Sequence, residues 1–247
     1  MPNPQGLATV LQLVDLVAVA VFAVTGALVA SRKQLDIVGF LWLGTITAVG
    51  GGTVRDLLLG VPVFWVASPP YVLVAAGASV LVFFTAHLTQ SRYRLIIWLD
   101  AVGLALVAVA GSEKALASGA GPVVAVVMGM LTACLGGILR DILGNERSIL
   151  LRREIYITAA LAGAIAHVCA DAAGAPPGMA AGIGFVAGFG VRALALVYGW
   201  SLPAYKARPG RTLDEIAALD LRGVVAARAS EGDERGGSTG LGPGAKQ

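Results

Sequence analysis

Charged and reactive side chains are scarce in this sequence. Asp, Glu, Lys and Arg make up 13% of its 247 residues, with two histidines and two cysteines. Because about a quarter of the residues in an ordinary soluble domain are charged, this composition argues against a large soluble enzyme and against a disordered chain. Cys134 and Cys169 stand in separate apolar segments without a cluster of histidines nearby, so neither a redox pair nor a zinc site is predicted.

Two motifs of common enzyme classes are missing as well. The sequence holds no G-x-x-x-x-G-K-[ST] loop and no H-E-x-x-H pair. We therefore predict a protein that is not an enzyme, without a metal site or a cofactor. The formal net charge is +3, and no nucleic acid partner is predicted.

Apolar residues are abundant instead, at 57% of the chain. A helix needs about 20 such residues to cross a bilayer core of ~30 Å. Their lack of strict alternation favours helices over barrel strands, and prolines stand at the start of three of them. We predict an all-α integral membrane protein with seven transmembrane helices, at roughly residues 7–31, 36–59, 69–90, 94–115, 121–144, 151–173 and 178–201.

Basic residues are concentrated in alternate connections between these segments. Such an excess of Lys and Arg marks the cytoplasmic side, and the opposite side has little more than Lys114. We expect a multi-pass protein of the cell (inner) membrane with its N-terminus outside and its C-terminus in the cytoplasm. Residues 204–247 are predicted to form a polar cytoplasmic tail that is partly disordered.

An internal repeat appears when the chain is aligned with itself at an offset of 85 residues. The pattern G-x-x-T-A-x-x-G-G-x-x-R-D occurs at residues 44–56 and again at residues 129–141. Each repeat contains three helices, an odd number, so the second must cross the membrane in the opposite sense. We predict two inverted three-helix repeats, residues 7–90 and 94–173, followed by a seventh helix at 178–201.

Glycines interrupt the second and fifth predicted helices at matching depths. Interior glycines weaken a helix, so we expect these two helices to be broken there, with the freed carbonyls lining a polar path. Close packing of the helices is the alternative. The candidate pore and ion-pathway residues are Gly50, Gly51, Gly52, Thr53, Arg55, Asp56, Gly136, Gly137, Arg140 and Asp141.

The charged residues after the glycines need partners, because a charge at the bilayer centre costs ~2.5–3.5 kcal/mol on insertion scales. Neighbouring residues point about 100° apart on a helix, so we expect each Arg and each Asp to bind another helix or a wet cavity rather than its neighbour. Either the aspartates attract cations, or all four charges form structural ion pairs. Asp15 and Asp100 occupy equivalent positions, either as acids that favour a helix dipole or as a possible pore mouth.

Together, the duplicated Gly-Gly-x-x-Arg-Asp signature and the seven-helix pattern resemble the prokaryotic form of the trimeric intracellular cation (TRIC) channels. The resemblance covers about residues 10–201. It implies a homotrimer with a pore in each subunit, built around the second and fifth helices. It also implies passive conduction of monovalent cations, potassium and sodium, with a preference for potassium. The triple glycine occurs only in the first repeat, since the second reads Leu135-Gly136-Gly137.

Two further interpretations stay open at this point. Membrane lipids are expected partners, and the basic cluster Arg147, Arg152 and Arg153 is a possible site for anionic headgroups, although the cytoplasmic bias of basic residues would also place it there. Inverted repeats and broken helices equally suit a secondary transporter of a small amino acid such as glycine. Saturable uptake would distinguish that function from channel currents.

Overall fold

The computed structural model describes residues 4–88, 91–146 and 155–202, of which residues 4–12 are described as backbone only. These residues belong to one structural unit, and the predicted polar tail at residues 204–247 lies outside the described part of the chain. The described helices are α1 (Pro4–Arg32), α2 (Ile37–Leu59), α3 (Phe64–Ala67), α4 (Pro70–Thr85), the short 3-10 helix η1 (Ala86–Leu88), α5 (Arg92–Ala117), α6 (Pro122–Leu143), α7 (Ile157–Ala172) and α8 (Pro177–Tyr198).

The prediction of an all-helical protein with seven apolar helices is confirmed within the described residues. Six helices are long and apolar enough to cross a membrane, and the seventh, α7, is a shorter apolar helix of 16 residues. It begins later than the predicted segment 151–173, whose first residues lie outside the described part. The four-residue helix α3, between α2 and α4, was not predicted.

Local sequence explains where several helices begin and end. The side chain of Asp36 accepts a hydrogen bond from the backbone N–H of Gly39 and caps the start of α2. Gly60 ends the same helix in the left-handed conformation, with φ of 67°. Prolines occupy the first turns of α4, α6 and α8, where a missing N–H leaves no hydrogen bond unmade.

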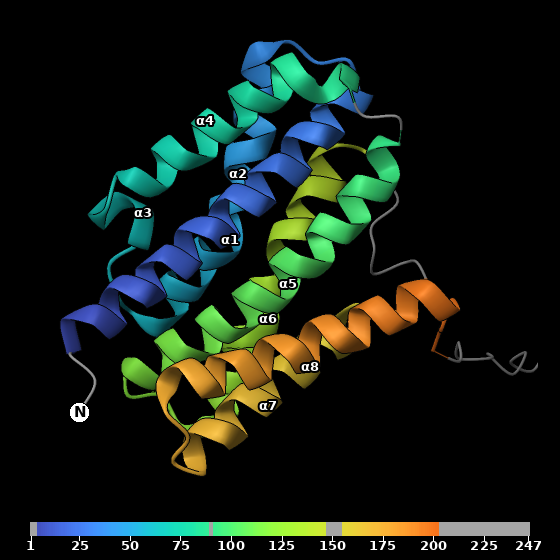
Figure 1. The fold of residues 1–247 in the computed structure, drawn as a ribbon. Helices are drawn as coiled ribbons and strands as arrows, with labels where there is room; N and C mark the ends of the chain where they lie inside the picture. Colours follow the sequence, from blue (N-terminus) through green and yellow to red (C-terminus); the bar gives the residue numbers. More distant parts are fainter. Residues whose placement is uncertain (1–3, 89–90, 147–154, 203–247) are drawn as a thin grey trace, which may run out of the picture. The chain divides into compact units, whose positions relative to one another are not determined.

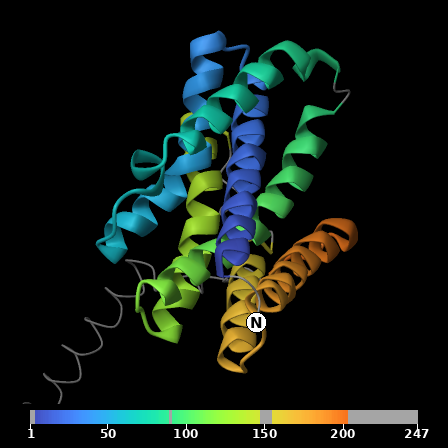
Figure 2. The ribbon, with the colours of Figure 1, turned by 60° about the vertical axis from the view of Figure 1, so that its left-hand side comes forward.

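The helices form two equivalent groups of three. Helices α1, α2 and α4 pack on one another, as do α5, α6 and α7, and the groups meet where α1 contacts α5 and α2 contacts α6 (Figures 1 and 2). Helix α8 packs on α7 and α5. This is the predicted arrangement of two three-helix repeats plus one helix.

Small residues make the close helix packing possible. Many of the fully buried core residues are alanines, among them Ala23, Ala101 and Ala133. Where α7 meets α8, a methyl group added to Gly163 would lie 3.1 Å from the carbonyl oxygen of Gly184. Because lipid supplies no hydrophobic drive for helix association, this close contact between backbones stabilises the bundle.

Candidate functional site

Gly51 and Gly136 mark the point where α2 and α6 cross. A methyl group added to Gly136 would lie 2.7 Å from the carbonyl oxygen of Thr47, and one added to Gly51 would overlap the carbonyl oxygen of Thr132. The two contacts are equivalent at the repeat offset of 85 residues. Because Gly51 meets Thr132 while Thr47 meets Gly136, the helices run in opposite directions, and the residues that follow each glycine lie on opposite sides of the crossing.

Both crossing helices are uninterrupted at their glycines. Helix α2 continues from Ile37 to Leu59, and α6 continues from Pro122 to Leu143. The prediction that the glycines break these helices and free their carbonyls is therefore wrong. Each glycine weakens its helix by ~0.5–1 kcal/mol relative to alanine, and the backbone contact that only glycine permits at the crossing offsets this cost.

The other predicted glycines and Thr53 face side chains rather than a carbonyl-lined path. Gly50 lies against the side chain of Leu139 on α6, and Gly52 lies against the ring of Phe64 on α3. A methyl group on Gly137 would lie 3.4 Å from Oδ1 of Asp100. The hydroxyl of Thr53 donates to the carbonyl of Val49 and accepts from the indole N–H of Trp65 at 2.9 Å.

The first charge cluster consists of Asp15, Arg55, Asp56 and Lys114. Nε of Arg55 donates to Oδ1 of Asp56 at 2.8 Å, and Nζ of Lys114 on α5 lies 2.9 Å from the same carboxylate. The backbone N–H of Phe64 also donates to Asp56, at 2.8 Å. Asp56 is fully buried, so these three donors supply the compensation that a buried carboxylate requires.

The second charge cluster consists of Asp100, Arg140 and Asp141. The buried guanidinium of Arg140 donates from Nη1 to Asp100 at 2.8 Å, and from Nη2 to Asp141 at 2.9 Å. Asp100 also has a second oxygen, Oδ2, that is buried without a hydrogen-bond partner in the described part of the chain, as is the hydroxyl of Tyr156. Oδ2 of Asp100 can therefore accept a further hydrogen bond, and the hydroxyl of Tyr156 can donate one.

The expectation that neighbouring Arg and Asp residues do not pair was wrong in both repeats. Arg55 binds Asp56, and Arg140 binds Asp141, although each pair is adjacent in sequence. The long arginine side chain folds back far enough to reach the next carboxylate. The expected partners on other helices are also present, namely Lys114 for Asp56 and Asp100 for Arg140.

Asp15 and Asp100 do not act as acids at helix N-termini. No acidic residue stands in the first turn of α1 or of α5, so the helix-dipole interpretation is wrong. Instead, Asp15 lines a cavity with Arg55, and Asp100 lines another with Arg140. Each aspartate thus lies beside the arginine of its own repeat.

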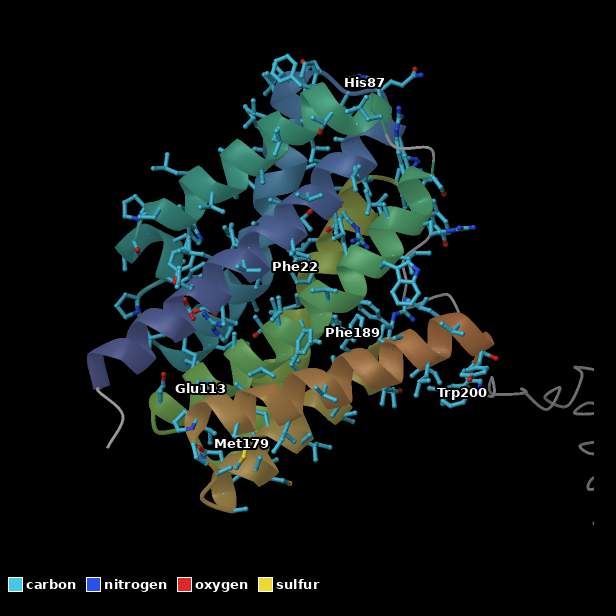
Figure 3. All side chains as sticks on the ribbon, in the orientation of Figure 1. Phe22, His87, Glu113, Met179, Phe189 and Trp200 are labelled. Atoms are coloured by element: carbon cyan, nitrogen blue, oxygen red, sulfur yellow. The ribbon has the colours of Figure 1, made fainter. Side chains whose placement is uncertain are left out.

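One cavity accompanies each charge cluster. The first, of about 40 Å³, is lined by Asp15, Arg55 and Phe64 among others, and the second, of about 20 Å³, by Asp100, Arg140 and Asp141 among others. Both exceed the ~10–15 Å³ that one water molecule needs. The buried ring of Phe22 lies at the crossing, near the middle of the bundle, and would contact a methyl group on Gly136 at 3.5 Å (Figure 3).

Sequence reasoning missed two residues at the first charge cluster, its member Lys114 and the neighbouring Phe64. Lys114 appeared only as a basic residue on the outer side, yet its place near the end of an apolar helix, after Glu113, was a signal that it needed a partner. Phe64 lies in a connection, and its ring is 5.8 Å from both the Arg55 guanidinium carbon and the Lys114 ammonium. Arg147, Arg152 and Arg153 lie outside the described residues.

Comparison with known proteins supports the repeat and assigns the family. The family model described as "Glycine transporter" matches twice, at residues 12–87 and 97–172, which repeats the offset of 85 residues. The TRIC channel orthologue from Rhodobacter sphaeroides is 60% identical, with a TM-score of 0.76 over 78% of this chain and 100% of that one. The chain belongs to the TRIC channel family.

Curated relatives of this chain are found in other bacteria. The UPF0126 inner membrane protein YadS of Escherichia coli is 47% identical over 63% of this chain and 76% of its own length. A UPF0126 membrane protein of Vibrio cholerae is 39% identical over 80% of this chain and 83% of its own length. The family assignment and the apolar helices identify a multi-pass membrane protein.

Proposed function

We propose that the chain is a passive monovalent-cation channel that prefers potassium, with one pore in each subunit of a homotrimer. The single observation that carries this proposal is the arrangement at the glycine crossing. A carboxylate-bearing cluster and a water-sized cavity lie on each side of it. Solved relatives named as cation channels support the same function.

The proposed path runs from one cavity to the other past the crossing of α2 and α6. In this conformation the backbones at Gly51 and Gly136 are in contact, and the ring of Phe22 is 2% exposed. Conduction therefore requires these helices to separate, with a cation moving from Asp15 on one side to Asp100 on the other.

Arg55, Lys114 and Arg140 serve as movable counter-ions in this proposal. Each holds a carboxylate that a permeating cation would otherwise meet. Arg55 and Lys114 engage both oxygens of Asp56, and Arg140 engages one oxygen each of Asp100 and Asp141. These positive side chains repel a doubly charged ion more strongly than a singly charged one, so the arrangement favours a monovalent cation.

The membrane arrangement belongs to the same proposal. We place the N-terminus outside and the C-terminus in the cytoplasm of an inner membrane, because most basic residues gather on one side. Anionic headgroups at Arg147, Arg152 and Arg153 remain part of the prediction. Native mass spectrometry should give the mass of three 25.0 kDa chains.

Planar-bilayer recording under a potassium gradient, with and without glycine, tests the function. We expect discrete currents that reverse near the potassium equilibrium potential and are unaffected by glycine. Replacing potassium with sodium should shift the reversal potential in favour of potassium. Absence of currents, combined with saturable glycine uptake into proteoliposomes from the same preparation, would contradict the channel and support a secondary transporter.

A further inference from the structure

A large groove lies between α1, α5 and α8, apart from the crossing of α2 and α6. Its volume is about 400 Å³, within the ~300–1,000 Å³ of typical ligand pockets. It shares Asp15 and Ala110 with the first cavity. Its lining includes Asp15 on α1, Leu106, Glu113 and Lys114 on α5, and Gly182 and Phe185 on α8.

The charged groups of the groove favour a positively charged ligand group. No hydrogen bond or ion pair joins Asp15 to another described residue, and Glu113 is bound through Oε2 to His167 at 3.1 Å. The ammonium of Lys114 is already held by Asp56 at 2.9 Å. Asp56 is shared by Lys114 and Arg55, so the groups in and beside the groove are three carboxylates, of Asp15, Asp56 and Glu113, against two cations. This excess of negative charge disfavours an anionic ligand.

The rest of the groove is apolar and open on the α8 side. Methyl groups added to Gly178 or Gly182 would have no neighbour within 4 Å among the described residues, whereas Gly184 and Gly188 on the same helix lie against α7. Helix α8 thus presents one small-residue face to the bundle and leaves the other uncovered. An apolar chain could lie along this second face.

The groove is charged at one end and apolar further along the helices. A membrane lipid has the same order, with a charged head and apolar chains. Glu113 and Lys114 lie near the C-terminal end of α5, and Gly178 lies in the first turn of α8. Leu106 is seven residues before Glu113, hence ~10 Å further along α5. Figure 3 places Glu113 and Met179 at the same end of the helices, opposite His87.

We propose that this groove binds a zwitterionic phospholipid with an ethanolamine head. The primary ammonium would bind the carboxylates of Glu113 and Asp15, and the phosphate would approach Lys114, whose side chain is 30% exposed. One acyl chain would pack on Leu106, Gly182 and Phe185. None of the groove residues belongs to the basic cluster Arg147, Arg152 and Arg153 that is predicted for anionic headgroups.

Native mass spectrometry of the detergent-purified protein tests the site by titration with phosphatidylethanolamine and phosphatidylglycerol of identical oleoyl chains. We expect the ethanolamine lipid to bind about tenfold more tightly, as one additional favourable charge contact would give. Asp15→Asn combined with Glu113→Gln should remove this preference. Gly182→Leu should weaken the binding of both lipids, because the leucine side chain would fill the groove. Gly190→Leu is the matched control, because this glycine of α8 also has no neighbour within 4 Å in the described part of the chain but does not line the groove.

Three results would overturn the proposal. The first is an unchanged preference in the double variant, and the second is unchanged lipid binding by Gly182→Leu. The third is a disulfide between subunits formed by Gly182→Cys, which would assign this face to a second copy of the chain. Because every readout is lipid binding or cross-linking, failure of the channel proposal would leave these outcomes unaffected.

Discussion

Lys114 of α5 and Asp56 of α2 join the two repeats through a 2.9 Å ion pair. At the repeat offset of 85 residues, the position equivalent to Lys114 is Val29, so this link belongs to the first charge cluster alone. The second cluster binds its arginine to Asp100 of α5 instead. The two halves of the proposed pathway therefore hold their carboxylates with different cations.

Lys114→Met should increase cation conductance by about two- to five-fold, equivalent to ~0.4–1 kcal/mol of barrier. The substitution removes a positive charge beside the proposed path, while Arg55 and the Phe64 N–H still hold Asp56. Single-channel recording measures the effect. Lys114→Arg keeps the charge and is expected to retain wild-type conductance; an equal rise in both variants would refute an electrostatic cause.

Arg140→Gln should lower the free energy of unfolding by ~3–5 kcal/mol, because it leaves the carboxylates of Asp100 and Asp141 buried without their guanidinium. Thermal unfolding in detergent would report the loss. Adding Asp100→Asn should restore part of the stability, since contacting residues couple by ~0.5–3 kcal/mol. Additive losses in the double variant would mean that the pair does not interact as described.

Gly51→Ala should destabilise the protein by ~1–3 kcal/mol, since the methyl group would overlap the Thr132 carbonyl and force the helices apart. The matched control is Gly77→Ala in α4, where a methyl group would have no neighbour within 4 Å in residues 4–88, 91–146 and 155–202. That change should be neutral or stabilising by up to ~1 kcal/mol. Equal unfolding temperatures for the two variants would show that the helices are not in tight contact at the crossing.

Phe64→Ala should enlarge the first cavity and raise conductance, because the ring lines that cavity. The ring lies against Gly52 and is 5.8 Å from both the Arg55 guanidinium carbon and the Lys114 ammonium. Val66→Ala is the control within the same short helix, since Val66 is 64% exposed. Bilayer recording of both variants separates loss of the ring from general loosening of α3. Unchanged conductance in Phe64→Ala would exclude the ring as an obstruction.

The sequence was sufficient to predict the helices and the repeat, because long apolar runs and a duplicated motif are local signals. Helix starts at Pro122 and Pro177 were likewise predictable from the missing N–H of proline. The length of α7 and the presence of α3 were not, since neither changes the apolar pattern. The glycines were predicted to matter, but their role depends on a backbone in the other repeat that the motif does not reveal.

Four charged residues of the candidate site were predictable from the sequence, but their pairing and their partner Lys114 were not. Arg55, Asp56, Arg140 and Asp141 are buried as expected of charges within apolar helices. Their pairing with sequence neighbours depends on how far an arginine side chain folds back, which spacing alone does not determine. Lys114 escaped attention because its partner, Asp56, lies 58 residues away.

The reciprocal contacts of Gly51 with Thr132 and Gly136 with Thr47 bear on how such a protein could arise. A polypeptide holding one repeat would lack the opposing backbone that its glycine needs, and only a copy inserted upside down could supply it. A single-repeat ancestor would thus have had to assemble from oppositely oriented copies. Fusion fixes the two orientations in one chain and frees each half to change separately. Lys114 and Phe22 illustrate such changes, because their equivalent positions in the other repeat hold Val29 and Val107, respectively.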